Sequence, residues 1–193
     1  MARTVRPGWS LLLGGALAVS LLACSDDDGG DAADPDDPAT SPEDTTPATL
    51  PDEVDAGRGA MVIDGNAYVL TVRACDLEPT TDPATGVTTE LAVDADDGVG
   101  TSVSVTRSVT QGAVPSTTDT IRVADTAGNA LVASRAEVNG RFVDLLAEGA
   151  LAPMLDVEGD VVSGEGVLGP QGARPGTPGV VDVSVLLSCP PAG

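Results

Sequence analysis

The sequence predicts a mainly β protein: a single small antiparallel sheet or sandwich-like domain, preceded by a signal peptide and a disordered tether. Apolar and polar residues alternate with a period of two along 99–106 and 181–187, the pattern of half-buried strands. Gly, Pro or Asp-Gly separates the short Val- and Thr-rich segments that follow residue 59. Asp64-Gly65, Asn139-Gly140 and Glu158-Gly159-Asp160 suit hairpin turns, because Gly tolerates the positive φ that such turns need.

The candidate strands are short and rich in Val, Thr or Ala. They cover 61–63, 66–75, 87–93, 99–106, 120–124, 130–138, 141–147, 155–162, 165–168 and 181–187. A single short helix over 141–151 is the competing interpretation of one of them, because Phe142, Leu145 and Leu146 would share a helical face.

The N-terminus has the outline of a secretory signal peptide. Residues 1–9 carry Arg3 and Arg6 and no acid, and an apolar run of 13 residues follows over 10–22. This run is shorter than the roughly 20 residues that a membrane-spanning helix needs. We therefore expect export and cleavage rather than a permanent span.

The apolar run ends in Leu21-Leu22-Ala23-Cys24, which resembles the bacterial lipobox. The resemblance implies cleavage after Ala23 and a diacylglyceryl group on the Cys24 thiol. Together with palmitate-like acyl chains, this group would hold the protein at the extracytoplasmic face of the cell membrane, since two or three chains anchor firmly where one does not. The alternative is an ordinary secretory signal with an incidental cysteine.

Residues 24–58 are expected to be a disordered tether and residues 59–193 a β-rich domain. The tether is acidic, rich in Pro and Thr, and almost without apolar residues, so it cannot bury enough surface to offset chain entropy. Val-, Thr- and Ala-rich segments begin near Gly59.

Composition excludes several functions. The formal net charge of −21 disfavours nucleic acid, whose phosphates need a cationic face. Without histidine or lysine the chain lacks the commonest general base, the commonest neutral metal ligand and a P-loop. We expect no enzyme, cofactor or metal site, although paired carboxylates stay open as acid–base groups.

Two motifs fail in context. Residues 164–169 match G-x-G-x-x-G, but Pro170 prevents the helix that a dinucleotide site requires. Residues 94–98 hint at a calcium loop, yet the twelfth position from Asp94 is Val105 instead of glutamate. A turn at a strand end is the expected role of the second motif.

If Cys24 is lipidated, Cys75 and Cys189 are the remaining cysteines, and export to an oxidising compartment favours a disulfide between them. A free thiol pair and a metal site are the alternatives, although two cysteines without histidine are too few for zinc. Arg73 is expected on the sheet face of Cys75, because alternate side chains share a face.

These features resemble the mycobacterial 19 kDa lipoprotein antigen family. The resemblance includes the lipobox cysteine, the Thr/Pro-rich tether, Val62-Ile63-Asp64-Gly65, Cys75 about ten residues later, the hairpin-like segment 155–169, and a last strand that ends at Cys189. It covers the two ends of the domain, whereas 78–153 matches poorly. It implies a surface-displayed antigen, glycosylated on the tether and recognised by host receptors through its acylated end, without an established enzymatic role.

The sequence therefore leaves two alternative functions. One is a displayed lipoprotein with a structural or interaction β-domain. The other is a carrier of an apolar envelope ligand, held in a cavity between sheet and helix. A continuous packed core favours the first, and a lined cavity favours the second.

Overall fold

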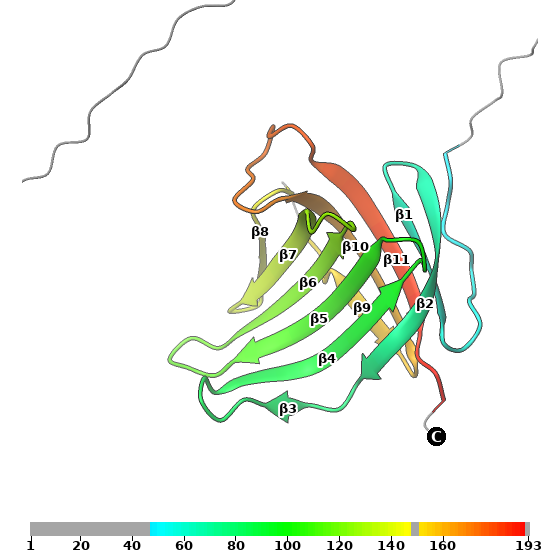
Figure 1. Cartoon of the computed structure of the whole chain (residues 1–193). Coiled ribbons are helices and arrows are strands. Elements are labelled where there is room, and N and C mark those ends of the chain that lie inside the picture. The colour runs from blue at the N-terminus through cyan, green and yellow to red at the C-terminus, as the bar shows by residue number, and fades with distance from the viewer. Residues whose placement is uncertain (1–46, 148–150, 192–193) are drawn as a thin grey trace, which may run out of the picture. The chain divides into compact units, whose positions relative to one another are not determined.

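The computed structural model describes residues 47–147 and 151–191, and these residues form an all-β domain (Figure 1). Its strands are β1 (Arg58–Ile63), β2 (Asn66–Asp76), β3 (Thr80–Thr81), β4 (Val87–Asp96), β5 (Ser102–Thr110), β6 (Ser116–Ala124), β7 (Ala130–Val138), β8 (Arg141–Asp144), β9 (Leu155–Glu158), β10 (Val161–Pro170) and β11 (Val181–Ser188). The prediction of an antiparallel β-domain is confirmed, since each pairing between these strands is antiparallel.

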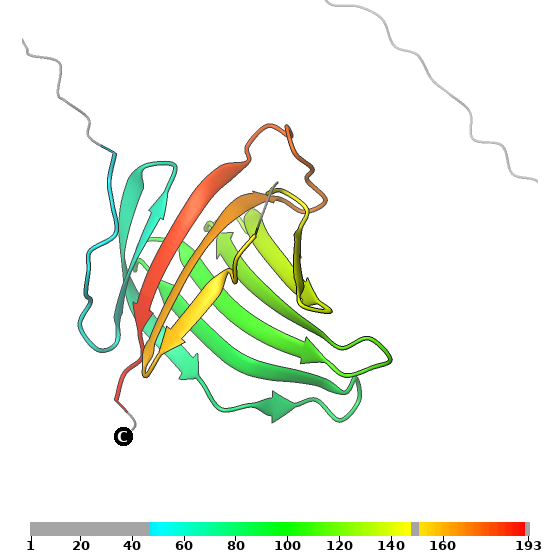
Figure 2. The same cartoon turned by 180° about the vertical axis from the view of Figure 1, so that it is seen from behind.

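The sheet closes on itself as a barrel. Neighbouring strands run in the order β7-β6-β5-β4-β2-β1-β11-β10, and β10 then pairs with β7. Figures 1 and 2 show β4 to β7 as one wall, with β10 and β11 in the opposite wall. The closing seam is short, because only Gly169 and Pro170 of β10 pair with Val132 and Leu131 of β7. Beyond this seam β8 pairs with β7 and β9 pairs with β10.

Side chains fill the barrel interior. Alternate residues of each strand point inward, and the interior of an eight-stranded barrel is just wide enough to be filled by side chains or to hold one small ligand. The largest fully buried side chains come from strands all around the barrel. They are Met61, Leu70, Val93, Val103, Val105, Ile121, Val162, Leu168, Val183, Val185 and Leu187.

Two of the predicted hairpins have the backbone of type I′ turns. Asp64 and Gly65 have φ values of 47° and 74°, and Asn139 and Gly140 have values of 53° and 72°. Positive φ at both central residues matches the right-handed twist of the flanking strands. The third predicted turn, at Gly159, joins β9 to β10, so 155–162 is two strands rather than one.

The glycines of β10 make room for an inner segment. A Cβ added to Gly164 would lie 2.6 Å from Leu155 Cδ2, and one added to Gly166 would lie 3.1 Å from Met154 Sδ. Met154 and Leu155 are buried against this backbone. The G-x-G-x-x-G match thus lies within a strand, where its first two glycines serve packing.

The expected helix over 141–151 is wrong for the described part of that segment. Residues 141–144 form β8, and Asp144 ends it by accepting hydrogen bonds from the backbone amides of Leu146 and Ala147 at 2.8 and 3.2 Å. Pairing with β7 overrides the helical spacing of Phe142, Leu145 and Leu146, because the hairpin at Asn139-Gly140 returns the chain along β7.

The domain also begins earlier than residue 59. The Ala48 amide donates to the Gly65 carbonyl at 3.1 Å, and the Gly57 amide donates to the Ser188 carbonyl at 2.9 Å. Residues 47–57, which composition assigns to the tether, run along the β1–β2 hairpin (Figure 1). The rest of the expected signal peptide and tether, residues 1–46, lies outside the described residues.

Candidate functional site

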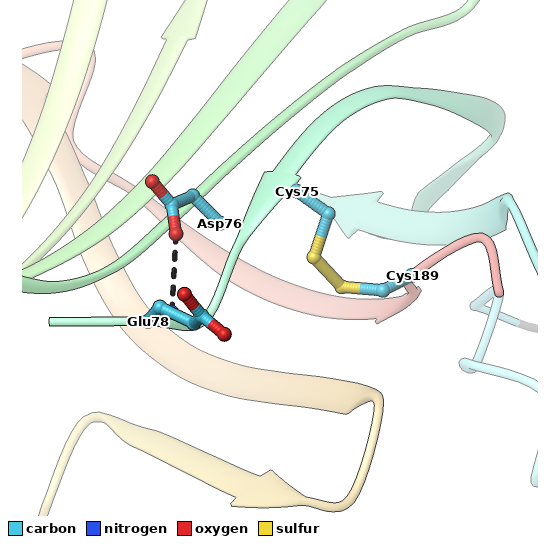
Figure 3. Close-up of a disulfide and its surroundings, with 4 residues drawn as sticks. All are labelled: Cys75, Asp76, Glu78 and Cys189. Atoms are coloured by element: carbon cyan, nitrogen blue, oxygen red, sulfur yellow. Dashed lines mark hydrogen bonds between the residues drawn. A yellow bond between two sulfur atoms is a disulfide. The ribbon is translucent and has the colours of Figure 1, made fainter. Parts of the chain in front are cut away.

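Cys75 and Cys189 are brought together at one end of β1. Strands β2 and β11 flank β1 and are both antiparallel to it, so they run parallel to each other past its first residue. Their ends meet there: the Cα atoms of Cys75 and Cys189 are 5.7 Å apart and their sulfur atoms are joined (Figure 3). Beside Cys75, the Asp76 carboxylate accepts a hydrogen bond from the Glu78 amide at 3.1 Å. The third cysteine, Cys24, lies outside the described residues.

A β-bulge gives Cys75 its inward direction. The register between β2 and β4 shifts between Val72 and Ala74, so Arg73 is the extra residue, and Cys75 then pairs with the inward-facing Val93. The expectation that Arg73 shares the face of Cys75 is therefore wrong, because a bulge breaks simple alternation. Arg73 instead forms a two-bond ion pair with Asp96 on the outer face, at 2.6 and 2.9 Å.

The interior also holds a ladder of four charged residues, which we call the charge ladder: Arg107, Asp119, Arg135 and Asp144. They occupy matching positions on the neighbouring strands β5, β6, β7 and β8. Arg107 donates to both carboxylate oxygens of Asp119 at 2.7 and 3.0 Å. Arg135 Nη2 lies 3.3 Å from Asp144 Oδ2. Cross-strand neighbours of opposite charge attract, and the two aspartates are nearly inaccessible, with exposed side-chain fractions of 7% and 1%.

The charge ladder holds the segment that follows β8. Arg107 Nη2 donates to the Leu155 carbonyl at 2.9 Å, and the Leu155 amide donates to Asp119 Oδ2 at 3.2 Å. Arg135 Nη1 donates to the Ala152 carbonyl at 2.8 Å. These bonds fix the backbone of residues 152–155 against the inner wall and explain why charged groups are tolerated there, since buried charges need both partners and hydrogen bonds.

An open hollow of about 380 Å³ lies beside the charge ladder. Its charged lining residues are Glu90, Arg107, Asp119, Arg135, Glu137 and Asp156. Hydrogen bonding to Asp119 raises the pKa of Arg107, and its partial burial opposes this increase. Within the described residues, no group of three or more His, Cys, Asp or Glu side chains has an arrangement suited to a metal ion.

The two carboxylates of the charge ladder already accept most of the hydrogen bonds that they can. The Asp119 oxygens accept from Arg107 and Leu155, and the Asp144 oxygens accept from Arg135 and two backbone amides. Of the roughly four lone-pair sites of a carboxylate, Asp119 thus uses three and Asp144 uses four. The charge ladder is therefore best understood as a structural brace.

Sequence reasoning missed this brace. Period-two alternation places Arg107 on the face of Val103 and Val105, and Asp119 on the face of Ile121 and Val123. The brace could have been suspected because an arginine and an aspartate each interrupt a row of inward-facing apolar residues. Their register depends on which strands are neighbours, which alternation does not give.

Residues 94–96 are the end of β4, and residues 97–98 begin the turn that follows it, so the segment lies at a strand end, as expected. Asp97 Oδ1 accepts hydrogen bonds from the amides of Val99, Gly100 and Thr101 at 2.8 to 2.9 Å. These backbone donors lower the pKa of Asp97 to about 2. They also keep 99–101 out of β5, which begins at residue 102 rather than at the predicted 99.

No family model, curated protein or solved structure matches this chain. Within its described part, no helix is long and apolar enough to cross a membrane.

Proposed function

We propose that the chain is an exported lipoprotein, anchored through Cys24, that displays its barrel outside the cell membrane as a non-enzymatic structural or interaction module. The observation that carries the proposal is the meeting of Cys75 and Cys189 across 114 residues. Structural disulfides form and persist in oxidising compartments and are rare in the cytosol. A long-range pair of this kind therefore supports export.

Two features support anchoring by a lipid. Cys24 ends the apolar run in the lipobox-like Leu21-Leu22-Ala23-Cys24, and pairing of the other two cysteines leaves it as the odd one. The formal net charge of −21 also repels the surface of an anionic membrane. Covalent acyl chains would supply the affinity that the protein surface lacks.

The interior supports display over transport. Side chains from the whole barrel wall pack into one core, and Met154 and Leu155 occupy additional space against β10. A cavity between sheet and helix, which the carrier hypothesis requires, has no counterpart in the described residues, where 141–144 is a strand. Carriage of an apolar ligand inside the domain is the less supported function.

The test is processing and location of the protein in a bacterial host that acylates lipoproteins. Wild type, Cys24→Ala and the neighbouring control Ser25→Ala are expressed with a clickable palmitate analogue and fractionated. We expect wild type and Ser25→Ala to be membrane-bound and labelled, with an intact mass for cleavage after Ala23 plus acyl groups. Cys24→Ala should be unlabelled and either unprocessed or released. A wild-type protein with a free Cys24 thiol would refute the anchor, and reduced cysteines at 75 and 189 in exported protein would refute the disulfide.

A further inference from the structure

A second hollow, of about 520 Å³, lies on the outer face of the barrel at its closing seam, and we call it the seam hollow. Arg122 and Val132 are cross-strand partners on β6 and β7, and Val132 is also the partner of Gly169 on β10. Leu145 and Leu146 after β8, Pro170 at the end of β10 and Ala173 after β10 border the hollow. The seam hollow thus covers the place where the barrel is closed by two residue pairs.

The residues around the seam hollow are partly apolar, and some of them pack closely on the β10 backbone. A Cβ added to Gly169 would lie 2.8 Å from Leu146 Cδ1 and 3.0 Å from Ala173 Cβ, so both side chains rest on the β10 backbone. Leu145, at the border, is 75% exposed. The volume falls within the roughly 300–1,000 Å³ of small-molecule sites. An apolar chain bound there would bury leucine surface that now faces water.

The free charge at this hollow is positive. Its two charged lining residues are Arg122 and Asp144. Asp144 is nearly inaccessible and bonded to Arg135. Arg122 is exposed, and among the described residues no carboxylate lies within ion-pair distance of it.

Two acids lie on neighbouring elements. Asp94 is separated from Arg122 by Ser104 in the cross-strand row. Asp125 accepts hydrogen bonds from the amides of Ala127 and Asn129 in the β6–β7 turn. Neither lines the seam hollow, so an anionic group is the complement to its lining.

We propose that the seam hollow binds a single-chain amphiphile with an anionic head. The head pairs with the Arg122 guanidinium, and the acyl chain lies along Val132, Leu145 and Leu146. Such a ligand contacts both β7 and the segment after β10, so it binds the closed barrel better than an opened one and stabilises it by mass action. This inference does not depend on acylation of Cys24 or on display.

The test uses the chain from residue 24 with Cys24→Ser, which carries no acyl chain and needs no detergent. The probes are decanoate, decyl phosphate, neutral decyl maltoside and inorganic phosphate, titrated by calorimetry at about 0.15 M salt and below micelle formation. We expect one site for decanoate and for decyl phosphate, with a Kd of roughly 0.1 to 1 mM and a higher Tm. The maltoside and inorganic phosphate should each bind at least about tenfold more weakly, because each lacks one of the two contacts.

Two variants and their matched controls locate the site. Arg122→Gln should weaken decanoate binding by roughly tenfold or more, whereas Arg141→Gln, at an exposed arginine of β8, should not. Leu145→Asn should weaken binding, whereas Val99→Asn, at an 86% exposed valine in the β4–β5 turn, should not. Equal binding of decanoate and decyl maltoside, retention of affinity in Arg122→Gln, or no binding of decanoate up to several millimolar would each overturn the proposal.

Discussion

Removing the Cys75–Cys189 link should cost the domain a large share of its stability. The two cysteines are 114 residues apart. In the chain-entropy model, closing a loop of that length in the unfolded state stabilises the native state by about 5 kcal/mol. A typical domain has only about 5–15 kcal/mol in total, so the fold depends strongly on this one bond.

The perturbation is the double variant Cys75→Ser/Cys189→Ser in a Cys24→Ser background. For a chain of this size, each kcal/mol shifts Tm by about 2–4 °C, so we expect a decrease of roughly 10–20 °C by scanning calorimetry. Adding a reductant to the Cys24→Ser protein should give a similar decrease. Cys24→Ser alone is the matched control and should leave Tm unchanged.

In this model the disulfide acts on the entropy of the unfolded chain and leaves the native strand pairing unchanged. Far-UV circular dichroism of the double variant below its Tm should still be that of a β-protein, because strand pairing does not depend on the bond. A double variant whose Tm stays within about 2 °C of the control would refute the stabilising role. So would a parent protein whose Tm is insensitive to reductant while both thiols react with alkylating reagent.

Three further predictions concern packing and charge. Asp119→Ala should lower the free energy of unfolding in urea by about 3–5 kcal/mol, because it leaves the Arg107 charge uncompensated. The double variant Arg107→Met/Asp119→Leu should regain much of this stability. If the effects of the two substitutions on stability simply added, the coupling between the two residues would be contradicted. Gly164→Val should cost about 1–3 kcal/mol through overpacking against Leu155, whereas Gly112→Ala, with nothing within 4 Å of the added carbon, should change stability by less than about 0.5 kcal/mol. The pKa of Asp97 is about 2 in the folded protein, against an ordinary value of 3.8, so the carboxylate stabilises the domain above about pH 4 and this stability is lost as the pH falls towards 2. Asp97→Asn should therefore be less stable than wild type at neutral pH and should lose less stability between about pH 4 and about pH 2. An acid-unfolding profile that the substitution leaves unchanged would contradict this.

The seam should be the first part of the barrel to open. Native-state hydrogen exchange would report this as faster exchange at the Leu131–Val132 end of β7 than in the middle of β5, because two residue pairs close the seam and nine join β5 to β6. Equal protection at both places would contradict it. Decanoate should slow the exchange at the seam if the seam hollow binds as proposed.

The sequence by itself determined the elements of this protein where the signal is local. Alternation and glycine turns gave most of the strands, and the turns at Asp64-Gly65 and Asn139-Gly140 have the expected backbone. These features depend on residues two to four positions apart, whose side-chain directions are set by the strand itself. The alternation failed at Arg73, where one inserted residue reverses the face of everything after it.

Only the tertiary structure decided how these elements combine. Phe142, Leu145 and Leu146 have helical spacing, yet 141–144 is a strand because β7 offers an edge to pair with. The meeting of Cys75 with Cys189, the row from Arg107 to Asp144 and the outer hollow beside Arg122 each require residues far apart in the chain to become neighbours. Periodicity states which way a side chain points but not which strand lies beside it, and in a closed barrel that neighbour relation is fixed by the global pairing of backbone donors and acceptors.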